Sequence, residues 1–77
     1  MGDGKLIVSD AVRNLMAMNQ ELVSAKYIAP ILRMKTETMV KKAKLGIWDR
    51  QVCNYIVSGR CVKFFRIDFL RKGGWIS

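Results

Sequence analysis

The stretch SAKYIAPILRMKTETMVKKAKLG, residues 24–46, decides the fold that we expect for this chain. Four of its apolar residues recur at helical spacing: Tyr27, Ile28, Ile31 and Leu32. This spacing predicts a short helix that ends near Arg33, with Ser24 as a possible cap. A proline is tolerated only in the first turn of a helix. Because of Pro30, we therefore expect the helix to start late, around residues 25–27, or to be bent.

A second helix follows after a short break in the same stretch. Thr36 can cap it, Glu37 places a negative charge in its first turn, and Gly46 can end it in the left-handed conformation. Met39 and Ala43 fall on one face of this helix. The opposite, basic face carries Thr36, Val40, Lys41 and Lys44. Residues 24–46 therefore predict a helix-turn-helix with one exposed basic face.

The next segment, QVCNYIVSGRCVKFF over residues 51–65, changes to a period of two and predicts a β-hairpin. We place Ser58 and Gly59 in a two-residue loop, because Gly59 can adopt the positive φ that such a loop demands. In this register Tyr55 faces Val62. The core face is then formed by Cys53, Tyr55, Val62 and Phe64, and the other face exposes Asn54 and Lys63. Cys53 and Cys61 lie on opposite faces, so no disulfide is expected.

The two ends complete a single α+β domain. Residues 1–8 are expected to be a flexible lead. Ser9 and Asp10 resemble a helix cap and an acidic first turn, and the apolar spacing that follows predicts an N-terminal helix over 9–19. A C-terminal helix is predicted over 66–73, stopped by two glycines, with Trp75 and Ile76 packing back onto the core. Residues 9–77 thus form one expected domain.

The positive charge is concentrated in the second part of the chain. The whole chain has 14 Lys and Arg against 6 Asp and Glu, a formal net charge of +8. Residues 1–32 are neutral overall, so residues 33–77 hold all of this charge. A basic surface of this kind favours a polyanion as the partner, above all nucleic acid.

Several other classes of function are disfavoured. The chain has no histidine and no cluster of Cys or acidic residues with metal-ligand spacing, so we expect neither a metal nor another cofactor, and no catalytic residues. No apolar stretch has the length of a membrane span, and the first residues lack the pattern of a signal peptide. We therefore expect a cytoplasmic, non-enzymatic protein.

The expected order, a helix-turn-helix followed by a hairpin with a cationic tip, is that of a winged helix-turn-helix bound to double-stranded DNA. The second helix would enter the major groove, and the hairpin would touch the neighbouring backbone or the minor groove. Lysines mainly pair with phosphates, whereas threonine hydroxyls and valine methyl groups can meet base edges. The predicted DNA-binding residues are Lys35, Thr36, Thr38, Val40, Lys41, Lys44, Arg50, Arg60 and Lys63.

Two segments resemble a known family of DNA-binding domains. ELVSAKYIAPILRMKTETMVKKAKLGIW, Glu21 to Trp48, is similar to the first half of excisionase and MerR-like winged-helix domains. GRCVKFFRIDFLRKGGW, Gly59 to Trp75, resembles their wing and final helix. The likeness is one of pattern and order, and it is greatest to the small excisionases of lambdoid and related temperate phages or prophages. The chain departs from the family at Pro30 and in the additional helix over 9–19.

The resemblance implies a recombination directionality factor in a bacterial host, associated with the nucleoid. Such a protein binds several sites in attachment-region DNA, bends the DNA and directs the phage integrase, a tyrosine recombinase, towards excision. Cooperative self-association on DNA is expected, and no membrane partner. Carried over to this chain, the resemblance assigns the major groove to Lys35, Thr36, Thr38, Lys41 and Lys44, and the wing contact to Arg60.

Two alternatives stay open from the sequence. The chain could be a small phage transcriptional regulator of the same fold, which would bind its site without the same bending. It could instead be a phage accessory protein that binds an acidic protein partner through Leu15, Met16 and Met18. The second alternative predicts little affinity for DNA.

Overall fold

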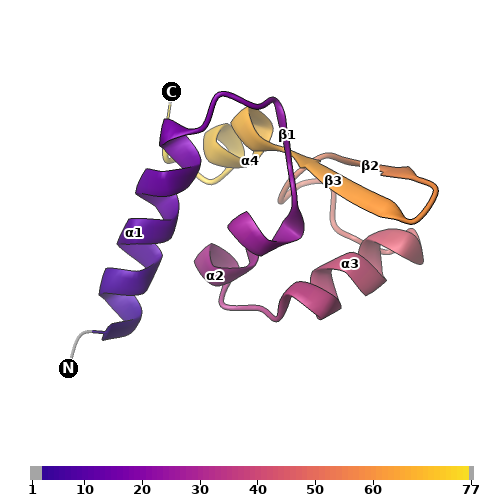
Figure 1. Cartoon of the computed structure of the whole chain (residues 1–77), viewed down its shortest axis with the longest axis horizontal. Coiled ribbons are helices and arrows are strands. Elements are labelled where there is room, and N and C mark those ends of the chain that lie inside the picture. Colours follow the sequence, from indigo (N-terminus) through magenta and orange to yellow (C-terminus); the bar gives the residue numbers. More distant parts are fainter. Residues whose placement is uncertain (1–2, 77) are drawn as a thin grey trace.

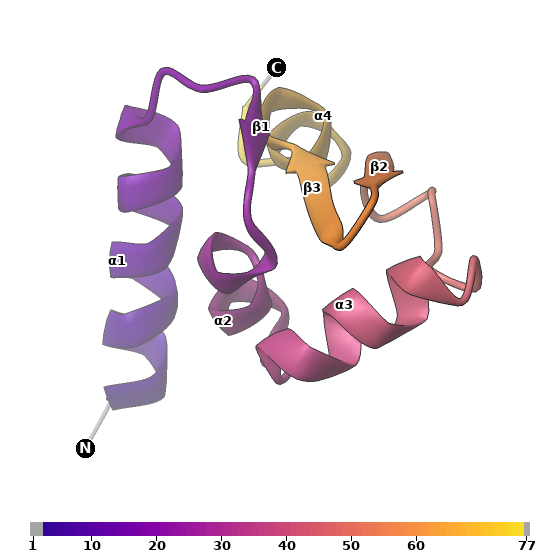
Figure 2. The ribbon, with the colours of Figure 1, turned by 45° about the vertical axis from the view of Figure 1, so that its right-hand side comes forward.

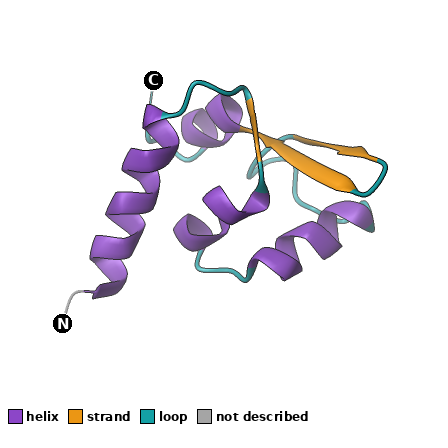
Figure 3. Ribbon diagram, in the orientation of Figure 1, coloured by secondary structure: helices purple, strands orange, loops and turns teal. Residues whose placement is uncertain are grey.

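The computed structural model describes residues 3–76, with side chains from residue 10 onward. Over this range the fold is α+β, with four α-helices and a three-stranded antiparallel sheet (Figures 1 and 3). The helices are α1 (Asp3–Ala17), α2 (Ala29–Leu32), α3 (Thr36–Lys44) and α4 (Arg66–Lys72), with a 3-10 helix η1 (Ala25–Tyr27) before α2. The strands are β1 (Leu22–Val23), β2 (Tyr55–Ser58) and β3 (Cys61–Phe65). Helix α1 stands at one end of the molecule beside α2, and α3 lies under the β2–β3 hairpin (Figure 2).

The N-terminal helix is longer than the sequence predicted. It begins at Asp3, within the segment expected to be a flexible lead, and ends at Ala17 rather than near residue 19. Ser9 therefore lies inside α1 and does not cap it. The physical reason is that a residue able to cap a helix does not oblige it to start there, and residues 5–8 contain neither proline nor glycine to stop it. Met1 and Gly2 lie outside the described residues.

The helices predicted within residues 24–46 are present, and most of their predicted ends are confirmed. The Ser24 side chain accepts a hydrogen bond from the backbone N–H of Lys26 at 3.3 Å, and η1 and α2 divide the first helix so that Pro30 falls in the first turn of α2. Gly46 follows α3 with a φ of +74°. The predicted capping by Thr36 is wrong. The carbonyl of Lys35 already accepts bonds from two N–H groups of α3, so Lys35 is the cap residue and Thr36 is the first helical residue.

The hairpin has the predicted faces but a different register. Ser58 pairs with Cys61, so the loop is Gly59–Arg60 rather than Ser58–Gly59, and Tyr55 pairs with Phe64 instead of Val62. Gly59 has a φ of +59° at the first loop position, where a type II′ turn prefers glycine. The register moves by two residues, and because side chains alternate with a period of two, each one keeps its predicted face. Tyr55, Val62 and Phe64 are buried, and Lys63 is exposed.

The strand β1 was not predicted. Leu22 and Val23 pair with Phe65 and Phe64, which makes β3 the central strand in the order β1-β3-β2. Two residues are too few to show the alternating pattern by which strands are recognised in a sequence. The pairing nevertheless matters for the site, because it holds η1 against the base of the hairpin.

The core lies between the sheet and the helices. Its fully buried side chains include Leu15, Ile28, Met39, Phe64 and Phe69. The Trp48 ring meets the Phe64 ring edge-on, with centroids 5.5 Å apart, and its indole N–H donates to the Cys53 carbonyl at 3.1 Å. Helix α4 is confirmed close to its predicted range, with Gly73 as its cap. Ile76 packs against the core as expected, whereas Trp75 stays 44% exposed.

None of the described helices combines the length and the hydropathy that a membrane span needs.

The two cysteines should differ sharply in reactivity. Both are free, but Cys53 is buried and Cys61 is exposed. Burial, together with the nearby charge of Asp68, raises the pKa of the Cys53 thiol to about 12, so its reactive thiolate is scarce at pH 8. Titration of the native protein with a chromogenic disulfide reagent should release about one equivalent rapidly, and a second only after denaturation. Two fast equivalents would contradict the burial of Cys53.

Candidate nucleic-acid interface

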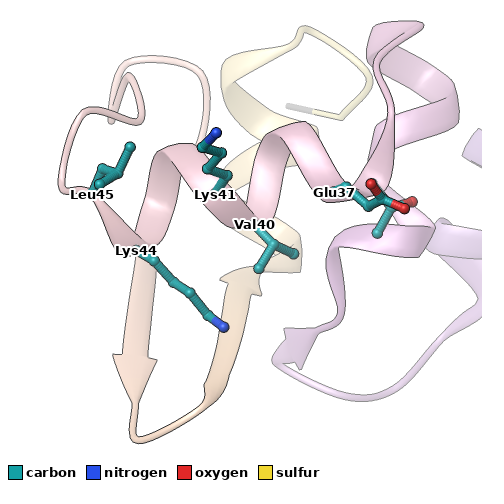
Figure 4. Close-up of a pocket in the computed structure, with 6 residues that line it drawn as sticks. Glu37, Val40, Lys41, Lys44 and Leu45 are labelled. Carbon is teal, nitrogen blue, oxygen red and sulfur yellow. The ribbon is translucent and has the colours of Figure 1, made fainter.

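The outward face of α3 is the first element of the candidate site. Met39 and Ala43 are buried in the core and Val40 packs partly against it, whereas the other side chains of the helix are exposed. Its surface holds a shallow, open hollow of about 410 Å³ (Figure 4). The hollow is lined by Thr36, Glu37, Val40, Lys41, Lys44 and Leu45. Figure 4 shows the Lys41 and Lys44 side chains projecting to different sides of the helix, with Glu37 nearer its beginning.

Four of the predicted DNA-binding residues meet in this hollow: Thr36, Val40, Lys41 and Lys44. Over the described residues the one ion pair is between Lys72 and Asp68 at 3.1 Å, so no carboxylate there neutralises Lys41 or Lys44. Lys35 is exposed at the cap position just before the helix. This end of the site therefore combines free cations with hydroxyl and methyl groups.

Thr38 is exposed but does not line the hollow. Successive residues of an α-helix are about 100° apart, which places Thr38 about 160° around the helix from Val40. A major groove receives one side of a helix. Thr38 and Val40 therefore lie at opposite margins of the exposed surface of α3, with Lys41 between them.

The hairpin residues divide between two locations. Arg60 is exposed in the loop at the tip of the hairpin. Lys63 lies between the buried Val62 and Phe64 on β3, so its side chain is on the outer face of the sheet. Helix α3 packs on the inner face, because Met39 shares the core with Phe64. The structure thus places Lys63 across the sheet from α3.

Arg50 makes contacts within the protein. Its guanidinium lies 4.3 Å from the centre of the Tyr55 ring and donates hydrogen bonds to the Asn54 side chain and the Tyr55 carbonyl. These contacts fix the connection between α3 and the hairpin. Arg50 is exposed, but it supports the start of β2 rather than the hollow on α3.

Sequence reasoning missed three residues at or near this surface. Glu37, which the sequence analysis places in the first turn of the helix, lines the hollow, and Leu45 lines it at the other end. A helical wheel would have placed both on the basic face. Arg33, in the turn between α2 and α3, adopts a left-handed conformation with φ 57° and ψ 40°. No sequence signal marks it, because glycine or asparagine is the usual residue in that conformation.

The left-handed conformation of Arg33 gives a prediction on stability. Its N–H closes α2 by donating to Pro30 at 3.2 Å, so the backbone there is fixed. Because glycine adopts this conformation without steric cost but loses more freedom on folding, Arg33→Gly should raise the free energy of unfolding by about 0.5 kcal/mol. Arg33→Ala, which keeps the steric cost, should not raise it. Urea unfolding of the three proteins tests this, and a glycine variant less stable than the alanine variant would contradict it.

Comparisons of the chain with protein-family models, with curated proteins and with solved structures each found no match. The geometry of α3 with the hairpin and the net charge of +8 are therefore the features from which a function can be inferred. Both point to a surface that accepts an extended anion.

Proposed function

We propose that this chain is a non-enzymatic, sequence-specific protein that binds double-stranded DNA through a winged helix-turn-helix. In this proposal η1, α2 and α3 form the helix-turn-helix, and the β2–β3 hairpin is the wing. The observation that carries it is the exposed face of α3, where Lys41, Lys44 and Val40 line one hollow beside a hairpin with Gly59 and Arg60 at its tip. That order and placement suit one helix in a groove and one loop on the adjacent backbone.

The residues of α3 have distinct roles in this proposal. Lys41 and Lys44 pair with phosphates on the two walls of the major groove, because their side chains leave the helix on different sides. Thr36 and Val40 meet base edges, the hydroxyl by hydrogen bonding and the methyl groups against a thymine methyl. Arg60 reaches the backbone or the minor groove from the wing.

We further propose that the chain acts as a phage or prophage excisionase in the cytoplasm of a bacterial host. The support is the resemblance of residues 21–48 and 59–75 to that family, together with a net charge of +8. In this role it binds and bends attachment-site DNA and directs the integrase, a tyrosine recombinase, towards excision. The protein does no chemistry itself, and copies associate cooperatively along the DNA.

A gel-shift titration tests the proposal. The protein is titrated on attachment-region DNA of its own phage or prophage and on random DNA, at two salt concentrations. We expect tighter binding to the attachment region, a ladder of discrete complexes and a steep loss of affinity with salt. Equal affinity for both DNAs would overturn sequence-specific binding. Binding without a change in DNA bend angle would instead indicate a small transcriptional regulator of the same fold.

One observation favours a protein partner as a second candidate. An open hollow between α1 and the C-terminus is lined by Val12, Arg13, Met16, Ala17 and Trp75. Met16 is 46% exposed and Trp75 is 44% exposed, and exposed Met and Trp side chains are typical of protein contacts. Leu15, which the sequence grouped with Met16, is buried in the core. If DNA affinity proves negligible at physiological salt, this hollow becomes the primary candidate site.

A further inference from the structure

A second basic hollow lies away from α3, on the outer face of the sheet. It is open, has a volume of about 350 Å³, and forms where the α1–β1 connection, β1 and η1 meet β3. The residues that matter for its chemistry are Gln20, Ser24, Lys26, Tyr27 and Lys63. Of these, only Lys63 is among the predicted DNA-binding residues, and no pattern in the sequence places it beside Lys26.

The pairing of β1 with β3 creates this hollow. Val23 pairs with Phe64, so Ser24 follows opposite Lys63, and η1 then brings Lys26 and Tyr27 to the same edge. The Lys26 ammonium lies 5.1 Å from the centre of the Tyr27 ring, which holds the cation at the surface. Two lysines far apart in the sequence thereby line one hollow.

The chemistry of the hollow suits a phosphate group. The side chains of Lys26, Lys63, Tyr27 and Gln20 all supply hydrogen-bond donors. The Ser24 oxygen already accepts from the Lys26 backbone, which leaves its hydroxyl free to donate. None of the described residues that line the hollow carries a carboxylate. A site with two cations, several neutral donors and no acid complements an anion with several acceptor oxygens.

The hollow and the α3 face are on different sides of the sheet. Lys63 is on the outer face of β3, whereas Met39 of α3 packs on the inner face. Figures 1 and 2 show α3 on one side of the hairpin. A straight duplex seated against α3 therefore runs on the far side of the sheet from this hollow. Resting on the proposed DNA-binding function, we propose that the Lys26–Lys63 hollow binds the phosphate backbone of DNA that flanks the segment contacted by α3, so that one molecule holds the duplex in a bent path.

The test measures the binding of the full chain to DNA duplexes of two lengths. One duplex has about 12 base pairs centred on the recognised site, roughly one helical turn, and the other has about 36 base pairs. The variant is Lys26→Ala with Lys63→Ala. The matched control is Lys42→Ala with Arg71→Ala, which removes two exposed cations elsewhere. Circular dichroism and thermal unfolding confirm that both variants are folded.

On the long duplex, we expect Lys26→Ala with Lys63→Ala to weaken binding by about tenfold and to reduce the salt slope by about 1.8, since each lost phosphate contact changes that slope by about 0.9. On the short duplex its affinity should equal that of the unmodified protein. Fluorescence energy transfer between the ends of the long duplex should show a smaller bend. The control should retain the bend and the difference in affinity between the two lengths.

Equal losses on both duplexes, or no loss on either, would overturn the inference while leaving α3 as the primary DNA contact. An unchanged DNA bend with the Lys26→Ala, Lys63→Ala variant would also overturn the inference. The proposed function fails in a different way, because the unmodified protein would then bind neither duplex better than random DNA. The two failures are therefore distinguishable in one set of titrations.

Discussion

Replacing Arg66 by alanine is expected to lower the free energy of unfolding by about 3 kcal/mol or more, a large part of what a domain of this size possesses. Arg66 is the one charged side chain buried among the described residues, at 8% exposure. Its Nε donates to the Gln20 carbonyl at 2.7 Å, and Nη1 donates to the Leu15 carbonyl at 3.0 Å and to the Met16 carbonyl at 3.5 Å. Removing the guanidinium takes the side-chain donor away from all three carbonyls and leaves the Leu15 carbonyl with only the backbone N–H of Met18, at 3.3 Å.

The effect is large because Arg66 donates hydrogen bonds to carbonyls at the C-terminal end of another helix, α1. The last carbonyls of an α-helix have no partner within it, and they carry the negative end of its dipole. The last turn of α1 contains no basic residue of its own. Arg66, at the beginning of α4 and about fifty positions along the chain, supplies the missing donors and the positive charge. The same contacts join α1 to the C-terminal part of the fold.

Urea unfolding, followed by circular dichroism, measures the effect. Arg66→Lys should also lose stability, because one ammonium cannot reproduce the fork of donors that spans these carbonyls. Arg71→Ala is the matched control, since Arg71 is exposed on the same helix, and it should change stability by no more than about 0.5 kcal/mol. A stability of Arg66→Ala equal to that of the control would contradict the role assigned to Arg66.

Under the proposed DNA-binding function, replacing Lys41 and Lys44 together by alanine is expected to weaken binding to DNA by about 30-fold at moderate salt and to reduce the salt slope by about two. Both ammonium groups lack an acidic partner in the described residues, so they are free to neutralise phosphates. Because phosphates carry no sequence information, specific and random DNA should lose affinity alike. Thermal unfolding should be nearly unchanged, since both side chains are exposed.

Lys42→Ala provides the control on the same helix. Its side chain lines a different hollow, with Met34, Ile47 and Trp48, on the other side of α3. The change removes the same charge and should leave the salt slope nearly intact. An equal loss of affinity per lysine for Lys42, Lys41 and Lys44 would show that total charge, rather than the exposed face of α3, governs binding.

Local signals were enough to predict several features of the site. The spacing of Met39 and Ala43 marked the buried face of α3, and the same period placed Thr36, Val40, Lys41 and Lys44 opposite. The cap at Ser24, the late start before Pro30 and the end at Gly46 also follow from rules that act within a few residues. A helix is periodic over several residues, so its faces can be read without knowing its neighbours.

The register of the hairpin could not be predicted from local signals. Alternation placed Tyr55 and Phe64 on the core face and Lys63 on the other, and this held although the register moved by two residues. The sequence SerGlyArg allows a two-residue loop in either position, and the period of two is satisfied by both. The choice between them depends on which pairs pack together, here Tyr55 beside Phe64 with ring centres 5.9 Å apart.

The sequence by itself thus determined the elements of the second part of the chain, their buried faces and the concentration of charge in residues 33–77, because these depend on spacing between near neighbours. The tertiary structure alone decided that β1 joins β3, that Arg66 completes α1, and that Lys63 lies beside Lys26 rather than beside α3. Each of these contacts joins residues about forty or more positions apart. Such contacts form because the whole chain must bury its apolar faces and satisfy its polar groups at once. This condition involves distant segments together, so it cannot be predicted from any short stretch of sequence.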